Sequence, residues 1–302
     1  MQVTPTATTV ETEAARRFRR SAQIGRALTK VNMFVLWLVL CGGAVLFMLP
    51  LYVMVVMSLK TAEEIANTSM WAWPVNPTFE NYRRLIFDES LNFGRKFVNT
   101  LILSVVPTVA SVLTGAMVAY PFARLNFVAR DRLFILLLST MMLPGVVTMI
   151  PGYVLYAWLG WINTYKPFII AAFFGGGAFG IFLIRQFMLG IPREMDEAAK
   201  IDGASHAVIF WRIILPNCGP VLATLAVFGF VGGFRDLMGP LMILNDPDKM
   251  NLEVGLRSLQ TTFRTEFHLM MAGSMLVLAP IFLIFLVSQR WFVKGITLTA
   301  GK

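Results

Sequence analysis

The chain has 302 residues, of which 57% are hydrophobic and 14% charged, and its formal net charge is +9. A soluble domain carries roughly a quarter charged residues, so this chain lacks the polar surface that a water-exposed globule needs. The composition predicts a membrane protein. It excludes a nucleic-acid-binding groove, because the basic residues do not interleave with aromatic residues on a polar face.

The first 30 residues precede any long apolar stretch and are predicted to form a cytoplasmic tail, residues 1–30. Residues 1–15 are rich in Thr and Ala and show no apolar periodicity, which is typical of disorder. Residues 16–30 hold six Lys or Arg residues, a pattern that favours a short basic helix on the membrane surface. The apolar stretch that follows is longer than the roughly 7 to 15 residues in the core of a signal peptide, so we expect an uncleaved first span.

Six uncharged windows follow, and about 20 apolar residues suffice to cross a bilayer as a helix. The windows cover residues 31–59, 97–123, 133–165, 167–184, 213–234 and 267–289. In the third window, Pro-Gly pairs at 144–145 and 151–152 are predicted to break the helix, which places its span near residues 133–150 and the remainder at the membrane surface. The sequence therefore predicts an all-α polytopic membrane protein with a six-span domain over residues 31–292.

The distribution of basic residues among the loops predicts the orientation of the chain. With the N-terminus in the cytoplasm, 16 of the 26 Lys and Arg residues lie on the cytoplasmic side, which then carries the whole net charge. Both termini are therefore predicted to be cytoplasmic, with a C-terminal tail over residues 293–302. The two longest external segments are residues 60–96 and about 235–267.

An ion-coupled secondary transporter is the main alternative among membrane proteins. Such carriers usually place Asp, Glu, Lys or Arg side chains inside the bilayer, and none of the six predicted spans has an ionisable residue in its centre. Interruptions such as the triple glycine 175–177 fit either broken transporter helices or close helix packing. Uptake that survives ATP depletion while the proton gradient is kept would identify the secondary carrier.

No catalytic, metal or cofactor site is predicted. The chain has two Cys and two His residues without metal-ligand spacing. It also lacks the GxSxG and HExxH patterns, and Ser274 and His268 are six residues apart, whereas helical neighbours are three or four apart. A membrane enzyme is therefore not indicated.

The cytoplasmic loop at residues 191–216 differs from ordinary connecting sequence and predicts two short helices joined at a glycine. Pro192 suits a first helical turn, the acids at 194–197 suit the positive N-terminal end, and Gly203 can take the left-handed conformation that ends a helix. The second helix, from about Ser205, carries apolar residues around much of its circumference, as expected for a segment buried against its own bundle. A solvated amphipathic loop is the simplest alternative.

Together these residues resemble the EAA loop of ATP-binding cassette importer permeases, with the Ala199–Ala204 stretch typical of the carbohydrate-uptake branch. The resemblance extends over nearly the whole chain from about residue 31. It is carried by segments at 58–60, 77–82, 97–100, 119–124, 142–144 and 150–151, which look like maltose-type permeases. The ATPase-coupling residues that the resemblance implies are Glu197, Ala198, Ala199, Asp202, Gly203, Leu215 and Pro216.

The resemblance implies a six-span subunit of the type I importer permease fold, located in a bacterial-type plasma membrane. Its implied partners are a second related permease, two ATP-binding cassette ATPase subunits and an extracytoplasmic solute-binding protein. The EAA loop would be the coupling helix, with Glu197 paired to a basic residue of an ATPase. This chain would have no cofactor of its own, since ATP and Mg²⁺ would bind the ATPases.

Two segments depart from the family pattern, and one external segment suggests a contact. Residues 232–237 lack the Trp-Asn pair that often precedes an acidic residue, and the tail at 294–302 is altered and short. The external segment 245–265 is longer and more polar than a minimal turn requires, so we expect it to touch the binding protein. The expected substrate is a sugar, an oligosaccharide or a related polyol.

Overall fold

The computed structural model describes residues 33, 35–260 and 266–299, with side chains described as far as residue 288. It divides into two units, residues 1–56 and 57–302, and each is described by itself. The predicted tail at residues 1–30 lies outside the described residues. The first helix, Val35–Ser58, has 24 residues, a mean hydropathy of 2.4 and largely exposed apolar side chains. It is long and apolar enough to cross a membrane.

In the second unit, α4 (Phe93–Arg124) is the central helix. It packs against α12 (Gly219–Phe234), α8 (Ala178–Leu189) and α7 (Lys166–Ala172), and α12 also packs against α15 (Phe267–Thr299). Small residues permit the close approach. A Cβ at Gly115 of α4 would lie 3.3 Å from the carbonyl oxygen of Gly175, and a Cβ at Gly229 of α12 would lie 2.9 Å from Thr108 Oγ1.

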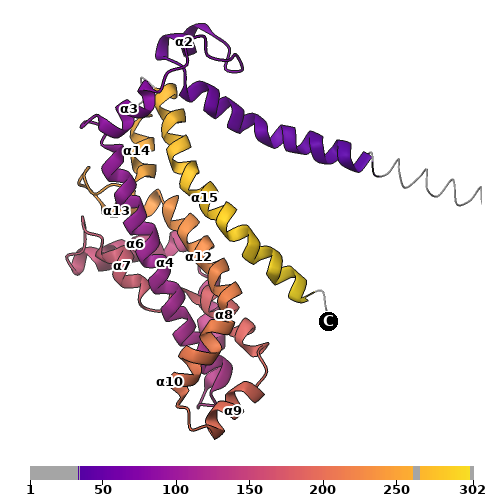
Figure 1. The fold of residues 1–302 in the computed structure, drawn as a ribbon. Coiled ribbons are helices and arrows are strands. Elements are labelled where there is room, and N and C mark those ends of the chain that lie inside the picture. The colour runs from indigo at the N-terminus through magenta and orange to yellow at the C-terminus, as the bar shows by residue number, and fades with distance from the viewer. Residues whose placement is uncertain (1–32, 34, 261–265, 300–302) are drawn as a thin grey trace, which may run out of the picture. The chain divides into compact units, whose positions relative to one another are not determined.

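The other short helices lie toward the two ends of α4. In Figure 1, α3 (Glu80–Phe87) and α14 (Leu252–Ser258) lie at the end opposite α9 (Glu194–Ile201) and α10 (His206–Ile209). The remaining helices are α2 (Ala62–Asn67), α5 (Arg130–Ser139), η1 (Thr140–Met142), α6 (Gly145–Trp158), η2 (Phe210–Ile214), α11 (Leu215–Asn217) and α13 (Met238–Ile243).

Three helices are long and apolar enough to be membrane spans, within the described residues. They are Val35–Ser58, Phe93–Arg124 and Phe267–Ser288, and the number rises to five if each of two bent helix pairs is one span. The pairs are Arg130–Met142 with Gly145–Trp158, bent by 98°, and His206–Asn217 with Gly219–Phe234, bent by 74°. The all-α fold is confirmed, whereas the count of six spans stays a prediction.

The third predicted window breaks at only one of its two Pro-Gly pairs. The chain turns at Pro144, whose ψ of 134° is extended, and α6 then begins at Gly145. The break expected at Pro151 and Gly152 is wrong, because α6 continues through both residues to Trp158. Pro151 is the seventh residue of α6, so it removes the hydrogen bond to the carbonyl of Val147 without ending the helix.

The fourth window is divided by its glycines. Gly175, Gly176 and Gly177 all have positive φ angles, which glycine adopts without strain. As a result α7 ends at Ala172, and α8 begins at Ala178 and continues beyond the window to Leu189. At the C-terminus, α15 continues to Thr299, past the tail boundary predicted at residue 293.

Candidate functional site

Helix α9 begins two residues after Pro192, so the prediction that Pro192 lies in its first turn is wrong, because the first helical hydrogen bonds run to the carbonyl of Arg193. Buried Ile191 anchors the chain before the helix, Pro192 follows, and the helix itself starts at Glu194. Its first turn holds Glu194, Asp196 and Glu197, and its last turn holds Lys200. This charge order opposes the helix dipole and stabilises a helix of only eight residues.

The end of α9 is fixed by a glycine turn. Gly203 has a φ of 80°, its N–H donates to the carbonyl of Lys200 at 3.0 Å, and the N–H of Ala204 donates to the carbonyl of Ala199 at 2.9 Å. These two bonds form a Schellman motif, in which the residue after the C-cap is left-handed. The prediction that Gly203 ends the first helix is confirmed.

The faces of α9 divide the predicted coupling residues. Glu197, Ala198 and Asp202 are exposed, and the Ile201 side chain beside them is 87% exposed. Ala199 is half-buried and packs against a group of residues that we call the basal cluster. The basal cluster consists of Ala116, Ala119, Tyr120, Ala123, Ile181, Ile184, Met188, Ile191, Ile209, Phe210, Ile214, Cys218, Val221 and Leu225.

The second helical segment begins at Ser205, whose hydroxyl caps it by accepting from the N–H of Val208 at 3.4 Å. Its middle is the π-helical turn η2, in which the N–H of Leu215 donates to the carbonyl of Phe210. Pro216 follows, and since proline cannot donate to the ladder, the wider turn accommodates it. Leu215 packs against the basal cluster and Pro216 is exposed, so both belong to this segment rather than to the exposed face of α9.

One buried ion pair joins α9 to α4. The Nε atom of Arg124, the last residue of α4, lies 3.4 Å from Oδ2 of Asp196, and the two side chains are 2% and 11% exposed. An η-nitrogen of Arg124 also donates to the carbonyl of Ile191 at 2.9 Å. This pair was not predicted from the sequence, because Asp196 has a local explanation as an acid at the positive end of a helix and Arg124 lies 72 residues before it.

Further polar contacts surround this end of α4. The hydroxyl of Tyr120 lies 3.4 Å from Nδ1 of His206, which connects α4 to α10. Arg185 of α8 donates from Nε to the carbonyl of Phe122 at 3.2 Å, and its guanidinium lies 4.1 Å from the centre of the Phe134 ring. The C-terminal end of α4 is therefore bound by side chains from three other helices.

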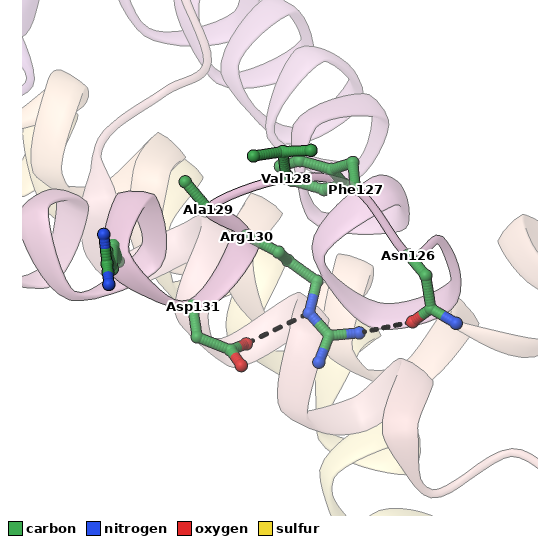
Figure 2. Close-up of a pocket in the computed structure, with 7 residues that line it drawn as sticks. Asn126, Phe127, Val128, Ala129, Arg130 and Asp131 are labelled. Atoms are coloured by element: carbon green, nitrogen blue, oxygen red, sulfur yellow. Dashed lines mark hydrogen bonds and ion pairs between the residues drawn. The ribbon is translucent and has the colours of Figure 1, made fainter.

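The loop at residues 126–132 lines an open pocket of about 490 Å³ next to this end of α4. Figure 2 shows Arg130 directed back into the loop, where Nε contacts the Asp131 carboxylate at 3.0 Å and an η-nitrogen donates to Asn126 Oδ1 at 3.1 Å. The Val128 side chain at the tip is 93% exposed. Because Arg130 is used within the loop, the pocket offers little for recognising a ligand.

At the opposite end of α4, the external segment after α13 is fastened to the bundle. The Asn99 amide donates to the carbonyls of Asp248 and Met250 at 2.7 and 3.0 Å, and Arg95 forms an ion pair with Asp248 at 3.3 Å. The Thr100 hydroxyl accepts from the N–H of Leu252 at 2.8 Å. Most of this segment is therefore rigidly placed, which its polarity alone did not predict.

A second fastening comes from Asn163, which has a φ of 60°. Its side-chain oxygen accepts from the N–H groups of Asn245 and Asp246 at 3.2 and 3.0 Å. Asn245, Pro247 and Asp248 remain exposed. Arg257, Ser258 and Gln260 of the predicted contact segment are exposed as well, and its residues 261–265 lie outside the described residues. The contact with a binding protein stays a prediction.

The departure from the family pattern at residues 232–237 has a structural role in this chain. Phe234 is buried, and the Asp236 carboxylate accepts from the N–H of Gly239 at 3.1 Å at the start of α13. The carbonyl of Asp236 accepts from the amide of Asn251. Over the described residues, no group of three or more His, Cys, Asp or Glu side chains is placed to hold a metal ion.

Comparison with known proteins gives one family and several close relatives. Residues 111–298 match the family model described as binding-protein-dependent transport system inner membrane component. The arabinooligosaccharides transport system permease protein AraQ of Halalkalibacterium halodurans is 31% identical over 90% of this chain and 99% of its own length. The galactooligosaccharides transport system permease protein GanQ of Bacillus subtilis is 32% identical over 90% of this chain and 96% of its own length.

A solved structure has the same fold. It is the crystal structure of a bacterial ABC transporter involved in the import of the acidic polysaccharide alginate, and one of its chains is 22% identical to this one. The match covers 87% of this chain and 97% of that chain, with a TM-score of 0.78.

Proposed function

The chain belongs to the family of binding-protein-dependent transport system inner membrane components, and from this membership we propose its function. It is a permease subunit of an ATP-driven importer and forms half of the translocation pathway. A second, related permease supplies the other half. The ion-coupled secondary transporter considered from the sequence finds no support in the family match.

The observation that carries the proposal is the exposed face of α9. Glu197, Ala198 and Ile201 are exposed together on a short helix whose two ends are fixed by Ile191 and Gly203. This face, with its acidic Glu197 next to a small Ala198 and an exposed apolar Ile201, suits a groove that has one basic side chain and an apolar wall. We assign this face to the ATPase, with Glu197 on an Arg or Lys residue of that subunit.

The position of α9 in the bundle supports the cytoplasmic assignment of this end. The helix lies at the end of α4 opposite α3 and α14 (Figure 1), and the loops at this end hold Arg130, Arg132 and Arg193. The positive-inside rule places such loops in the cytoplasm. Both termini are then cytoplasmic as well, as the basic N-terminal residues suggest.

Transport follows from movement of α9 with the ATPases. When the two ATPase subunits close on ATP, they displace the coupling helices and switch the permease pair from inward-open to outward-open. Hydrolysis and release reverse the change. The permease has no catalytic site of its own in this scheme, and the ATP and Mg²⁺ are held by its partners.

The substrate class follows from the relatives. The names of AraQ and GanQ refer to arabinooligosaccharides and galactooligosaccharides, and the neighbouring structure imports a polysaccharide. We assign this chain to uptake of an oligosaccharide or a related sugar or polyol. The external turn at residues 245–248 is assigned to the binding protein, since it is exposed at the end opposite α9.

Reconstitution tests the function. The chain, copurified with its native permease, ATPase and binding-protein partners, is placed in proteoliposomes with ATP inside or outside, and uptake of arabino- and galacto-oligosaccharides is measured. We expect uptake that requires ATP and the binding protein and that persists when a proton ionophore is added. Uptake that persists without ATP and is abolished by the ionophore would contradict the proposal.

A further inference from the structure

We infer that the buried ion pair between Arg124 and Asp196 transmits movement of the coupling helix α9 to α4, the central helix of the bundle. Both are positioning residues, because neither lies on the face assigned to the ATPase. The inference rests on the proposed function. It adds the path by which force reaches the membrane-spanning helices.

The geometry makes one guanidinium the connection. Arg124 is the last residue of α4, and its side chain contacts both the carboxylate of Asp196 and the carbonyl of Ile191. Ile191 lies in the connection that joins α8 to α9. Arg124 thus contacts both the coupling helix and the segment that leads into it. Helix α9 therefore cannot shift relative to α4 without changing these contacts.

Few other contacts compete with this one. In the described part of the chain, no helix, α4 included, packs extensively against α9, whereas α4 packs extensively against α7, α8 and α12. Ala199 supplies an apolar contact to the basal cluster, but an alanine side chain has only one methyl group with which to make contacts. The chain itself joins α9 to α8 and to α10, and the ion pair adds a direct side-chain connection from α9 to α4, which contacts the other helices.

Burial makes the pair sensitive to displacement. The two side chains are almost fully excluded from solvent, so their attraction is screened less than that of a surface pair. Nε of Arg124 and Oδ1 of Asp196 have no hydrogen-bond partner among the described residues. The two charged groups are close, but their atoms are not aligned for a hydrogen bond. A small shift of α9 therefore changes the interaction energy of the ion pair, as expected for a contact that differs between two conformations.

Other charges nearby do not share these properties. Glu194 and Glu197 on the same helix are exposed, and the Arg130–Asp131 pair in the adjacent loop has side chains that are 26% and 73% exposed. Exposed pairs contribute little. The Arg130–Asp131 pair has the same chemistry at the same end of α4 and therefore provides a matched control.

The test measures the number of solute molecules transported for each ATP hydrolysed in the reconstituted complex. Asp196→Asn removes the charge attraction at nearly constant volume, Arg124→Gln removes it with a shorter side chain, and Asp131→Asn is the control. We expect the Asp196→Asn and Arg124→Gln complexes to keep their ATPase subunits through purification. We expect each to lower the number of solute molecules transported per ATP about tenfold, which lies within the range of typical coupling factors. Asp131→Asn keeps the wild-type ratio.

Two further variants keep the inference falsifiable if the neutral variants do not assemble. The exchange Arg124→Asp with Asp196→Arg and the conservative Asp196→Glu both retain opposite charges, so each is expected to recover part of the ratio that the single changes lose. A wild-type ratio in Asp196→Asn, or no recovery in the exchange and in Asp196→Glu, overturns the inference. Absence of ATP-dependent uptake in the wild-type complex would instead be a failure of the proposed function.

Discussion

The backbone N–H of Ala204 donates to the carbonyl oxygen of Ala199 at 2.9 Å, and the bond closes around left-handed Gly203. Both alanines pack against the basal cluster, so the end of α9 is fixed by backbone and apolar contacts together. This turn also directs the chain into Ser205, which caps the next helix. Helix α9 therefore has a defined end.

Gly203→Ala is expected to weaken ATPase binding about tenfold. A Cβ at this position meets no atom within 4 Å, so the cost is conformational and not steric. A left-handed alanine costs roughly 1 to 2 kcal/mol, which corresponds to about a tenfold change in an equilibrium constant. The measurement is titration of the purified ATPase against the permease pair in nanodiscs.

The matched control for Gly203→Ala is Gly219→Ala. Gly219 also has open space around its Cβ position, but it stands in α12 without a positive φ. The Gly219→Ala variant is expected to bind the ATPase as tightly as the wild type does. Equal weakening by both substitutions would mean that the left-handed turn is unimportant.

Glu197→Gln is expected to reduce ATPase association about tenfold, since hydrogen bonds to charged groups are worth roughly 1.5 to 3 kcal/mol. Glu194→Gln removes another exposed carboxylate from the same first turn and is expected to change association little. Copurification of the ATPase at graded salt concentrations distinguishes them. If the two variants behave alike, Glu197 acts only through net charge and the specific pairing is wrong.

The sequence predicted the local features of this site well. The acids of the first turn and Gly203 act through interactions within a few residues and lie at the start and end of α9 as predicted, whereas Pro192 precedes the helix. The fourth window's triple glycine was noted, but its effect on α7 and α8 depends on positive φ angles that a pattern alone does not reveal. Local sequence signals therefore predicted that helices form in these regions but not where each helix is interrupted.

The contacts that the sequence did not reveal join distant residues. Arg124 and Asp196 have separate local explanations, as a loop cation and a helix-dipole acid, and only packing brings them together. Likewise, Asn99 and Asn163 form hydrogen bonds with a segment distant in the sequence, residues 245–250. Nothing in the sequence around either asparagine predicts these bonds. The length and polarity of residues 245–265 suggested an exposed contact segment, whereas residues 245–252 form several hydrogen bonds within the protein.

Asn163→Ala is expected to destabilise the external end of the second unit by about 2 kcal/mol. The change removes two hydrogen bonds, from the N–H groups of Asn245 and Asp246, at roughly 0.5 to 1.5 kcal/mol each. It also places alanine at a φ of 60°, which asparagine tolerates better. Asn163→Gly loses the same bonds without that strain, so thermal unfolding in detergent should rank wild type first, glycine second and alanine last. A glycine variant less stable than the alanine variant contradicts this account.

The stability that Asp246 contributes is expected to depend on pH. The N–H of Asp248 and the side chain of Lys249 hold the pKa of Asp246 below its ordinary value of 3.8. A carboxyl whose pKa is lowered on folding contributes stability above its unfolded pKa, and that stability is lost as the pH falls through the folded pKa. Asp246→Ala should therefore lower the unfolding temperature at pH 7 and pH 5, with the difference from wild type shrinking below about pH 4. A difference that does not change with pH would rule out the carboxylate as its source.

Replacement of residues 245–248 by a Gly/Ser tetrapeptide is expected to weaken binding-protein stimulation of ATP hydrolysis without loss of the permease pair. These residues form the exposed turn, and the replacement keeps the backbone carbonyl at position 248 that accepts from Asn99 but removes the Arg95–Asp248 ion pair. Met250, Asn251 and Leu252 are also bonded to the bundle and are kept. A control replaces residues 126–129, an exposed loop at the α9 end, with the same tetrapeptide. The measurement is the concentration of loaded binding protein that gives half-maximal ATPase activity, which should rise in the first variant and stay constant in the control. An unchanged concentration in the first variant, with normal assembly, would show that the binding protein docks elsewhere on the external end.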